Sequence, residues 1–175
     1  ISDGANQFVL NDDQVTYLEI LDVVLKSKAN DDNALKTLLG ESTYNYIDAD
    51  KVYTPLSDAF SKVQNELTEG KTIILYSGNA FESFLQQIAD EHSVSLVGKN
   101  GILQKSLALG NVLSKKHRGM IDYIGQVRNA ADHGADVDEG GKIWDVSEET
   151  SRVYPTIVAT VIKDIVLREN GTIHV

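Results

Sequence analysis

The segment from Val127 to Gly134 carries side chains whose types and spacing suit phosphoryl chemistry. It reads Val-Arg-Asn-Ala-Ala-Asp-His-Gly. An arginine fork stays charged and can hold two phosphate oxygens, and a histidine can move a proton near neutral pH. RNA supplies its own nucleophile, the 2′-hydroxyl. We therefore expect Arg128 and His133 to support transesterification of RNA without a metal or cofactor, with Asn129 orienting a phosphate, a ribose hydroxyl or the imidazole.

The spacing within this segment allows two interpretations. On a helix, Arg128 and Asp132 lie four residues apart and face each other, whereas Arg128 and His133 lie about 140° apart around the axis. A helix that ends near Asp132 would let His133 turn to the side of Arg128. The alternative is structural: an Arg128–Asp132 ion pair, and a histidine whose charge is favourable near a helix C-terminus. Spacing alone leaves both interpretations open.

Composition excludes several classes of function. The 175 residues carry a formal charge of −10 and contain no cysteine. The charge excludes a whole-surface electrostatic attraction to nucleic acid or anionic lipid. The lack of cysteine excludes a disulfide scaffold, an iron–sulfur cluster and a thiolate zinc site. No apolar run approaches the roughly 20 residues that cross a bilayer. We therefore expect a cytoplasmic protein with no secretory signal and no membrane contact.

One stretch of the chain departs from this acidic balance. Residues 99–130 hold six basic side chains and one acidic side chain. From this stretch we expect Lys115, Lys116 and Arg118 to bind the phosphodiester backbone of RNA. The alternative is a solvated helical face. His117, between them, is expected to be solvated or to face a phosphate, and His92 is expected to lie at a helix end, where its charge is favourable.

Apolar residues recur at helical spacing along most of the chain, and no long stretch alternates with period two. The predicted fold class is all-α, a bundle of about five or six helices, with a short strand or a frayed end at Thr172–Val175. Helices are expected over Asp13–Lys26, Asp31–Leu39, Pro55–Glu69, Lys71–His92, Ile102–Ser114, Arg118–Ala131 and Val146–Arg168.

Local signals refine these boundaries. Gly40 is expected to end a helix, and Ser42–Thr54 is expected to be a connector because its three tyrosines show no clear period. Asp145 and Glu148 have the spacing of a capping box. Gly78 lies inside the strongest helical pattern, where a glycine costs about 1 kcal/mol relative to alanine. Its presence therefore indicates close packing at that position.

The Arg128-Asn129-x-x-x-His133 pattern resembles the Arg-x4-His signature of the HEPN superfamily, all-α domains of antiviral defence, toxin–antitoxin and CRISPR-associated proteins. The helix at Ser77–Leu85 is similar to the family helix that carries a polar or acidic residue. Trp144-Asp-Val-Ser-Glu-Glu149, which opens a long apolar helix, is similar to the abortive-infection C-terminal branch. The resemblance covers about residues 55–168.

This resemblance implies a metal-independent endoribonuclease that acts as a homodimer, with two Arg/His pairs in one composite groove. His133 would transfer the proton and Arg128 would bind the phosphate and the transition state. Asn129 and Asp132 would support them, and Glu82 would orient the pair.

The resemblance also suggests how the chain is divided. Residues 55–175 would form the HEPN-like bundle, and residues 1–54 an N-terminal helical extension of unknown role. An upstream sensor domain or an antitoxin would be the partner protein. The alternative from another class is a catalytically inactive helical module for dimerisation or RNA binding within a larger defence or toxin–antitoxin protein.

Overall fold

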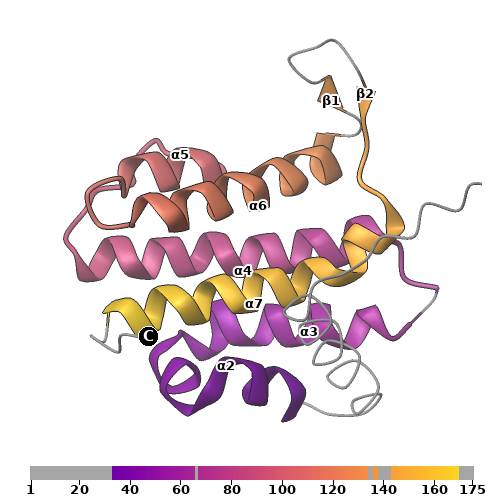
Figure 1. Ribbon diagram of the computed structural model, residues 1–175, viewed down its shortest axis with the longest axis horizontal. Coiled ribbons are helices and arrows are strands. Elements are labelled where there is room, and N and C mark those ends of the chain that lie inside the picture. Colours follow the sequence, from indigo (N-terminus) through magenta and orange to yellow (C-terminus); the bar gives the residue numbers. More distant parts are fainter. Residues whose placement is uncertain (1–32, 66, 134–135, 138–142, 170–175) are drawn as a thin grey trace, which may run out of the picture.

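The computed structural model describes residues 33–65, 67–133, 136–137 and 143–169 (Figure 1). The described part is a helical bundle, which confirms the predicted all-α class. Its α-helices are α2 (Asn33–Tyr46), α3 (Thr54–Val63), α4 (Gly70–Glu91), α5 (Gly101–Ala108), α6 (Lys115–His133) and α7 (Glu148–Glu169). A short π-helix, η1 (Ala49–Tyr53), precedes α3. Two-residue strands, β1 (Asp136–Val137) and β2 (Ile143–Trp144), form an antiparallel pair.

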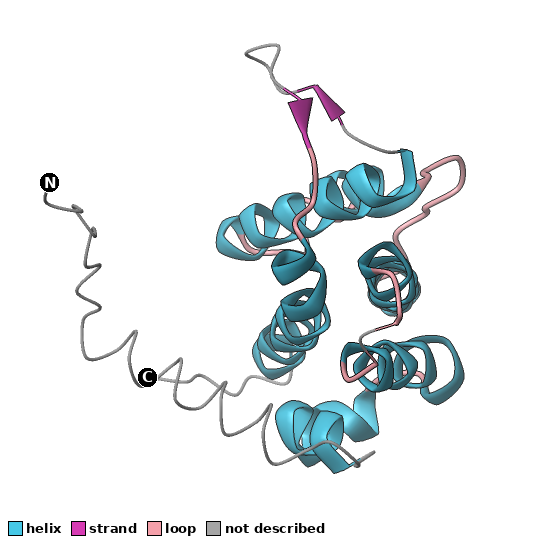
Figure 2. Cartoon of the chain, turned by 90° about the vertical axis from the view of Figure 1, so that its right-hand side faces the viewer, coloured by secondary structure: helices cyan, strands magenta, loops and turns pink. Residues whose placement is uncertain are grey.

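Helices α4 and α7 run side by side through the middle of the bundle. Helices α5 and α6 cover one side of this central pair, and α2 and α3 cover the other (Figure 1). The view in Figure 2 looks from the end of the bundle at which the strand pair lies. Apolar residues at three- and four-residue spacing explain the central position of α4, because Phe81, Phe84, Leu85 and Ile88 are all fully buried. Each such side chain contributes roughly 1.5–3 kcal/mol through burial.

Gly40 interrupts α2, as its sequence position predicts. Its backbone has φ 76° and ψ 162°, a conformation outside the helical region. Lys163 of α7 donates a hydrogen bond from Nζ to the carbonyl oxygen of Leu38, 3.0 Å away, and so satisfies a carbonyl next to the interruption.

The predicted connector at Ser42–Thr54 is wrong. The helix resumes after Gly40 and continues to Tyr46, and η1 follows it. Asp48 caps η1 by accepting hydrogen bonds from the backbone N–H groups of Asp50 and Lys51. A broken helix followed by a π-helix has no single repeat, so the buried residues of this stretch do not recur at regular spacing.

Two helix starts lie at serine residues that the sequence analysis did not use. Ser114 was expected to end the helix that begins at Ile102, but α5 ends at Ala108. Ser114 Oγ instead accepts a hydrogen bond from the N–H of His117, and α6 begins beside it at Lys115. Ser147 Oγ likewise accepts from the N–H of Thr150 at the start of α7. The predicted cap, Asp145, accepts instead from its immediate neighbour, Val146. A serine hydroxyl that satisfies a first-turn N–H group is a common helix start.

The core continues across the predicted domain boundary at residue 54. Leu35, Leu39 and Val52, from before the boundary, are buried in the same cluster as the central helices. The helix expected at Asp13–Lys26 and the strand expected at Thr172–Val175 lie outside the described residues, and the division of the chain stays a prediction. Among the described residues, no helix is long and apolar enough to span a membrane.

Candidate functional site

The Arg128–His133 segment forms the last turns of α6, at the end of the bundle where α4 and α7 begin (Figures 1 and 2). The first residue of α4, Gly70, packs directly against α7, because a Cβ atom there would lie 2.5 Å from Ser151 Oγ. Lys71 of α4 donates from Nζ to the backbone oxygen of Asp132 at 3.4 Å. The starts of α4 and α7 therefore lie beside the predicted motif, which itself ends α6.

The central feature of the motif is one carboxylate oxygen shared by two nitrogen atoms. Arg128 Nη1 lies 2.9 Å from Asp132 Oδ2, and this confirms the pairing predicted from the four-residue spacing. His133 Nε2 lies 3.9 Å from the same oxygen. The imidazole is charged only when it is protonated. A single oxygen atom therefore separates the guanidinium from the imidazole, although the two residues leave the helix in directions about 140° apart.

The three side chains differ in their access to solvent. The side chain of His133 is 77% exposed and that of Asp132 is 37% exposed, whereas that of Arg128 is only 19% exposed. The side chain of Arg128 is therefore largely enclosed by the protein, and that of His133 is open to solvent.

The stem of Arg128 lies in the groove between α4 and α6. A Cβ atom at Gly78 would lie 2.6 Å from Arg128 Cγ, so the absence of a side chain at Gly78 is what lets the arginine pass. This confirms the close packing predicted from the interior glycine. The Nε atom of Arg128 is buried and has no hydrogen-bond partner among the described residues.

Tyr154 of α7 lies next to this groove, because its hydroxyl oxygen would be 3.7 Å from a Cβ atom at Gly78. Its hydroxyl donates to the backbone oxygen of Ile124 at 2.8 Å, one turn before Arg128 on α6. Burial raises the pKa of the Tyr154 phenol far above its usual value, despite the opposing effect of the nearby Arg128 charge. The protonated phenol is therefore the favoured form, in which the hydroxyl donates the hydrogen bond to Ile124.

Lys71 is a candidate residue that the sequence analysis missed. It is exposed and lies against the backbone of Asp132, so it adds a lysine ammonium group near the motif. The expected helix at Lys71–His92 placed it at a helix start, but no signal along the chain links two positions 61 residues apart. Asn129, which was predicted to orient the substrate, is half-buried next to Arg128.

Glu82 was expected to orient the Arg/His pair, and the structure gives it other partners. Its Oε1 lies 3.1 Å from Lys105 Nζ and accepts from the backbone N–H of Gly101 at 3.3 Å. Both partners belong to α5, whose N-terminus favours a negative charge. Glu82 also lines a cleft of about 500 Å³ between α4, η1 and α5.

The predicted RNA-binding residues lie at the other end of α6. Lys115 begins the helix and His133 ends it, so the 18-residue separation places them about 27 Å apart at 1.5 Å per residue. Lys115 and Lys116 are exposed, whereas Arg118 is half-buried and its Nε is enclosed without a partner among the described residues. The basic cluster and the motif are therefore two separate regions, and RNA binding by the cluster stays a prediction.

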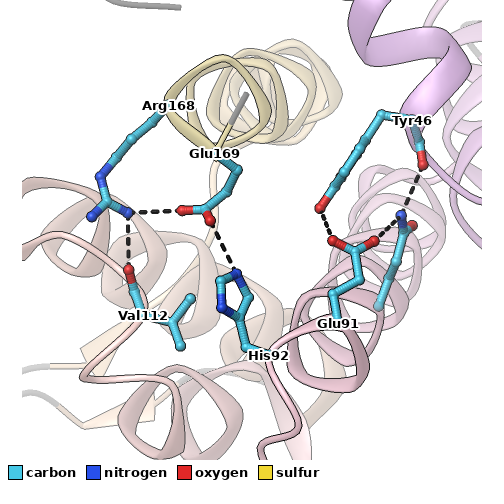
Figure 3. Close-up of polar contacts among 7 residues, drawn as sticks. Tyr46, Glu91, His92, Val112, Arg168 and Glu169 are labelled. Atoms are coloured by element: carbon cyan, nitrogen blue, oxygen red, sulfur yellow. Dashed lines mark hydrogen bonds and ion pairs between the residues drawn. The ribbon is translucent and has the colours of Figure 1, made fainter. Parts of the chain in front are cut away.

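The same end of the bundle as Lys115 holds a network of paired polar groups (Figure 3). His92 Nε2 lies 3.0 Å from Glu169 Oε2, and Arg168 Nη1 donates to Glu169 Oε1 and to the backbone oxygen of Val112, each at 2.9 Å. Tyr46 donates its hydroxyl hydrogen to Glu91. These contacts join α2, α4, α7 and the segment between α5 and α6. His92 is the C-cap residue of α4, as predicted, and it also links that helix to α7.

His117 was expected to be solvated or to face a phosphate, but its side chain is half-buried in the structure. Its Nδ1 is enclosed with no partner among the described residues. Burial, and then the charge of Arg168, lower the pKa of His117, while Asp164 and Glu169 act in the opposite direction. Folding therefore favours the neutral imidazole of His117 more than the unfolded chain does.

No described group of three or more histidine and acidic side chains is placed to hold a metal ion. Comparison with known proteins returns no family model, no curated protein and no solved structure that matches the chain.

Proposed function

We propose that this chain is a metal-independent endoribonuclease domain whose active site is the Arg128–His133 pair. The observation that carries the proposal is the shared oxygen Asp132 Oδ2, 2.9 Å from Arg128 Nη1 and 3.9 Å from His133 Nε2. Carboxylate and phosphate offer the arginine fork similar pairs of oxygen acceptors. A non-bridging phosphate oxygen of RNA would take the position that the carboxylate oxygen occupies.

The reaction follows from the roles of the two side chains. The neutral imidazole of His133 accepts the proton of a ribose 2′-hydroxyl, and the 2′-oxygen attacks the adjacent phosphorus. Arg128 stabilises the additional negative charge that develops on the phosphate oxygens. The bond from phosphorus to the 5′-oxygen breaks, and the imidazolium returns the proton to that oxygen. The products are a 2′,3′-cyclic phosphate and a 5′-hydroxyl end.

The surroundings of the pair support an anionic substrate. The imidazole of His133 is largely exposed, and Lys71 provides a further cation beside Asp132. The amides at the start of α4 add the positive end of a helix dipole. Local attraction of this kind is compatible with a formal charge of −10 on the whole chain, because salt screens charges that lie more than about 8–10 Å away.

The HEPN resemblance extends the proposal to the protein's setting. A second copy of the chain would bring a second Arg/His pair to the same groove, in a cytoplasmic effector of antiviral defence. An upstream sensor domain or an antitoxin would control it.

One observation favours a second candidate, a catalytically inactive module for RNA binding or dimerisation. Arg128 is already paired with Asp132, and an ion pair at the i, i+4 positions of a helix needs no substrate to explain it. The two candidates differ in a single respect, namely whether His133 transfers a proton.

A cleavage assay in EDTA separates them. Single-stranded RNA is incubated with wild-type protein, with His133→Ala and with Gln126→Ala, a matched control at an exposed position of the same helix. The proposal predicts cleavage by the wild type and by Gln126→Ala, with 2′,3′-cyclic phosphate ends. It predicts a loss of about 10²–10⁴-fold for His133→Ala, the usual contribution of a proton-transfer residue. Equal cleavage by all three proteins would reject His133 as the catalytic group, and RNA binding without cleavage by the wild type would favour the second candidate.

A further inference from the structure

We propose that Gly78 of α4 is a positioning residue for Arg128. Because Gly78 has no side chain, the stem of the arginine fits against α4, and only the terminal nitrogens of the guanidinium reach the substrate. This inference rests on the proposed function, because it concerns how the phosphate-binding group of that site is held. Gly78 does not touch the substrate. It acts through the arginine whose stem crosses it.

The geometry at Gly78 leaves no room for any side chain. A Cβ atom there would lie 2.6 Å from Arg128 Cγ and 3.4 Å from Arg128 Cβ, with the hydroxyl oxygen of Tyr154 at 3.7 Å. The first of these distances is shorter than real Cβ contacts, so either the arginine or the helix would have to move. The contact is with the base of the arginine side chain, not with its flexible tip.

The space at Gly78 controls the position of the guanidinium because it faces Cγ, near the base of the arginine side chain. A shift at Cγ is carried through Cδ and Nε to the guanidinium, so the terminal nitrogens move with it. Nε is enclosed and without a described partner, which leaves the Nη atoms to make the outward contacts. Nη1 makes the 2.9 Å contact with Asp132 Oδ2, so even a small displacement removes it from the position it shares with His133.

Tyr154 of α7 lies on another side of the space at Gly78. Its hydroxyl is bound to the backbone oxygen of Ile124, which lies four residues before Arg128 on α6. This hydrogen bond ties α7 to the turn of α6 from which the arginine stem projects. The stem therefore cannot relieve a clash with α4 by moving freely toward α7.

The test compares two buried glycines, one in α4 and one in α6, that pack against different side chains. Gly78→Ala introduces a methyl group against Arg128. Gly125→Ala, the control, introduces one against Leu103 Cδ2 of α5, at 2.5 Å, and none of the three atoms nearest to it belongs to the arginine. Gly78→Ala is expected to lower kcat/KM for RNA by about 10- to 100-fold, the effect of misplacing a reacting group by about 1 Å. Gly125→Ala is expected to change it by less than about threefold, because the atoms nearest to its methyl group belong to Leu103 and Ile102 of α5 and sites without a shared partner act independently.

A double-variant cycle shows whether the effect of Gly78→Ala passes through the arginine. In an Arg128→Ala background the clashing Cγ is gone, so adding Gly78→Ala is expected to change RNA binding no further. The same background covers the case in which Gly78→Ala alone does not fold, because the double variant is expected to fold. A double variant that loses binding beyond Arg128→Ala, or that remains unfolded, would overturn the proposal.

A measurement without RNA separates this inference from the proposed function. The enclosed Nε–H of Arg128 is expected to exchange slowly with water in the NMR spectrum of the wild type and of Gly125→Ala, and rapidly in Gly78→Ala. If the wild type neither binds nor cleaves RNA, the proposed function fails, and this exchange rate still decides whether Gly78 positions the arginine. Unchanged Arg128 exchange in Gly78→Ala would overturn the inference even in an active enzyme.

Discussion

The two ends of the helical bundle both hold histidine, arginine and acidic side chains, but they use them differently. At the end drawn in Figure 3, His92, Arg168 and Glu169 join separate elements, because their hydrogen bonds link α4, α7 and the segment between α5 and α6. At the opposite end, the pairs of Arg128 and His133 with Asp132 all lie within one helix.

Under the proposed function, this difference predicts which polar groups stabilise the fold and which take part in activity. A side chain that links two helices contributes to stability and is lost to other partners. A side chain that is 77% exposed, as His133 is, and that pairs only with its neighbour on the same helix contributes little to the fold. We therefore expect substitutions at the Figure 3 end to change stability, and substitutions at the end of α6 to change activity.

The largest contrast is expected between two arginines. Arg128→Ala is predicted to lower kcat/KM for RNA by about 10²–10³-fold, because it removes a preorganised charge from the transition state. Arg168→Ala, the matched arginine of the Figure 3 network, is predicted to leave kcat/KM within about threefold of the wild type, since additivity holds for distant sites. Steady-state cleavage kinetics measure both values. Equal losses for the two variants would contradict the predicted difference between the two ends of the bundle.

The next contrast is in stability and runs in the other direction. Glu169→Ala removes the partner of both His92 and Arg168, and it is predicted to lower the free energy of unfolding by about 1 kcal/mol. His133→Ala is predicted to change that free energy by less than about 0.5 kcal/mol, as an exposed substitution does. Urea denaturation followed by circular dichroism gives both numbers. A larger loss for His133→Ala than for Glu169→Ala would contradict the assignment of the two ends.

A smaller effect tests the shared oxygen itself. Asp132→Asn keeps the shape of the side chain but removes the negative charge between Arg128 and His133. RNA affinity at low salt is predicted to rise by about three- to tenfold, because a phosphate no longer competes with a carboxylate for the guanidinium, and a charge-assisted contact is worth about 1 kcal/mol when partly exposed. Fluorescence anisotropy with labelled RNA measures the change. Glu149→Gln, an exposed acid on α7, is the control, and an equal gain there would indicate a general charge effect.

The smallest effect concerns pH and the Figure 3 end. The pKa of His117 is lowered in the folded protein, first by burial and then by Arg168. The unfolded chain therefore binds the proton more tightly, so the stabilising contribution is complete above the unfolded pKa of about 6.5 and declines as the pH falls below it. His117→Gln is predicted to flatten the loss of stability between pH 7 and pH 5 in urea titrations. An unchanged slope would show that acidic groups alone set the pH dependence.

The sequence was informative about the fold where one residue period dominates. The expected helix at Lys71–His92 agrees with α4 (Gly70–Glu91) to within one residue at each end, because its buried residues keep the helical repeat throughout. The stretch 42–54 was misjudged because its burial depends on an interrupted helix and a π-helix. Ser114 was misjudged because its role as a cap depends on where the next helix starts.

In the candidate site too, features within one helix could be predicted from the sequence, whereas contacts between helices could not. The Arg128–Asp132 pair follows from a spacing of four on one helix, and Gly78 follows from the cost of a glycine inside a helix. The proximity of Lys71 to Asp132 depends on how α4 and α6 pack, and so does the partnership of Glu82 with Lys105 on α5. Contacts between helices depend on the packing of the whole bundle and leave no local pattern in the chain.

The claim that Arg128 and His133 together hold one phosphate is tested most directly by an NMR titration. The ligand is a short single-stranded RNA with methylated 2′-hydroxyls, which can bind but cannot be cleaved. The account predicts that the guanidinium signal of Arg128 and the imidazole signals of His133 shift together with one dissociation constant, while those of His92 and His117 stay in place. Shifts confined to the Lys115 end of α6, or movement of His133 without Arg128, would contradict it.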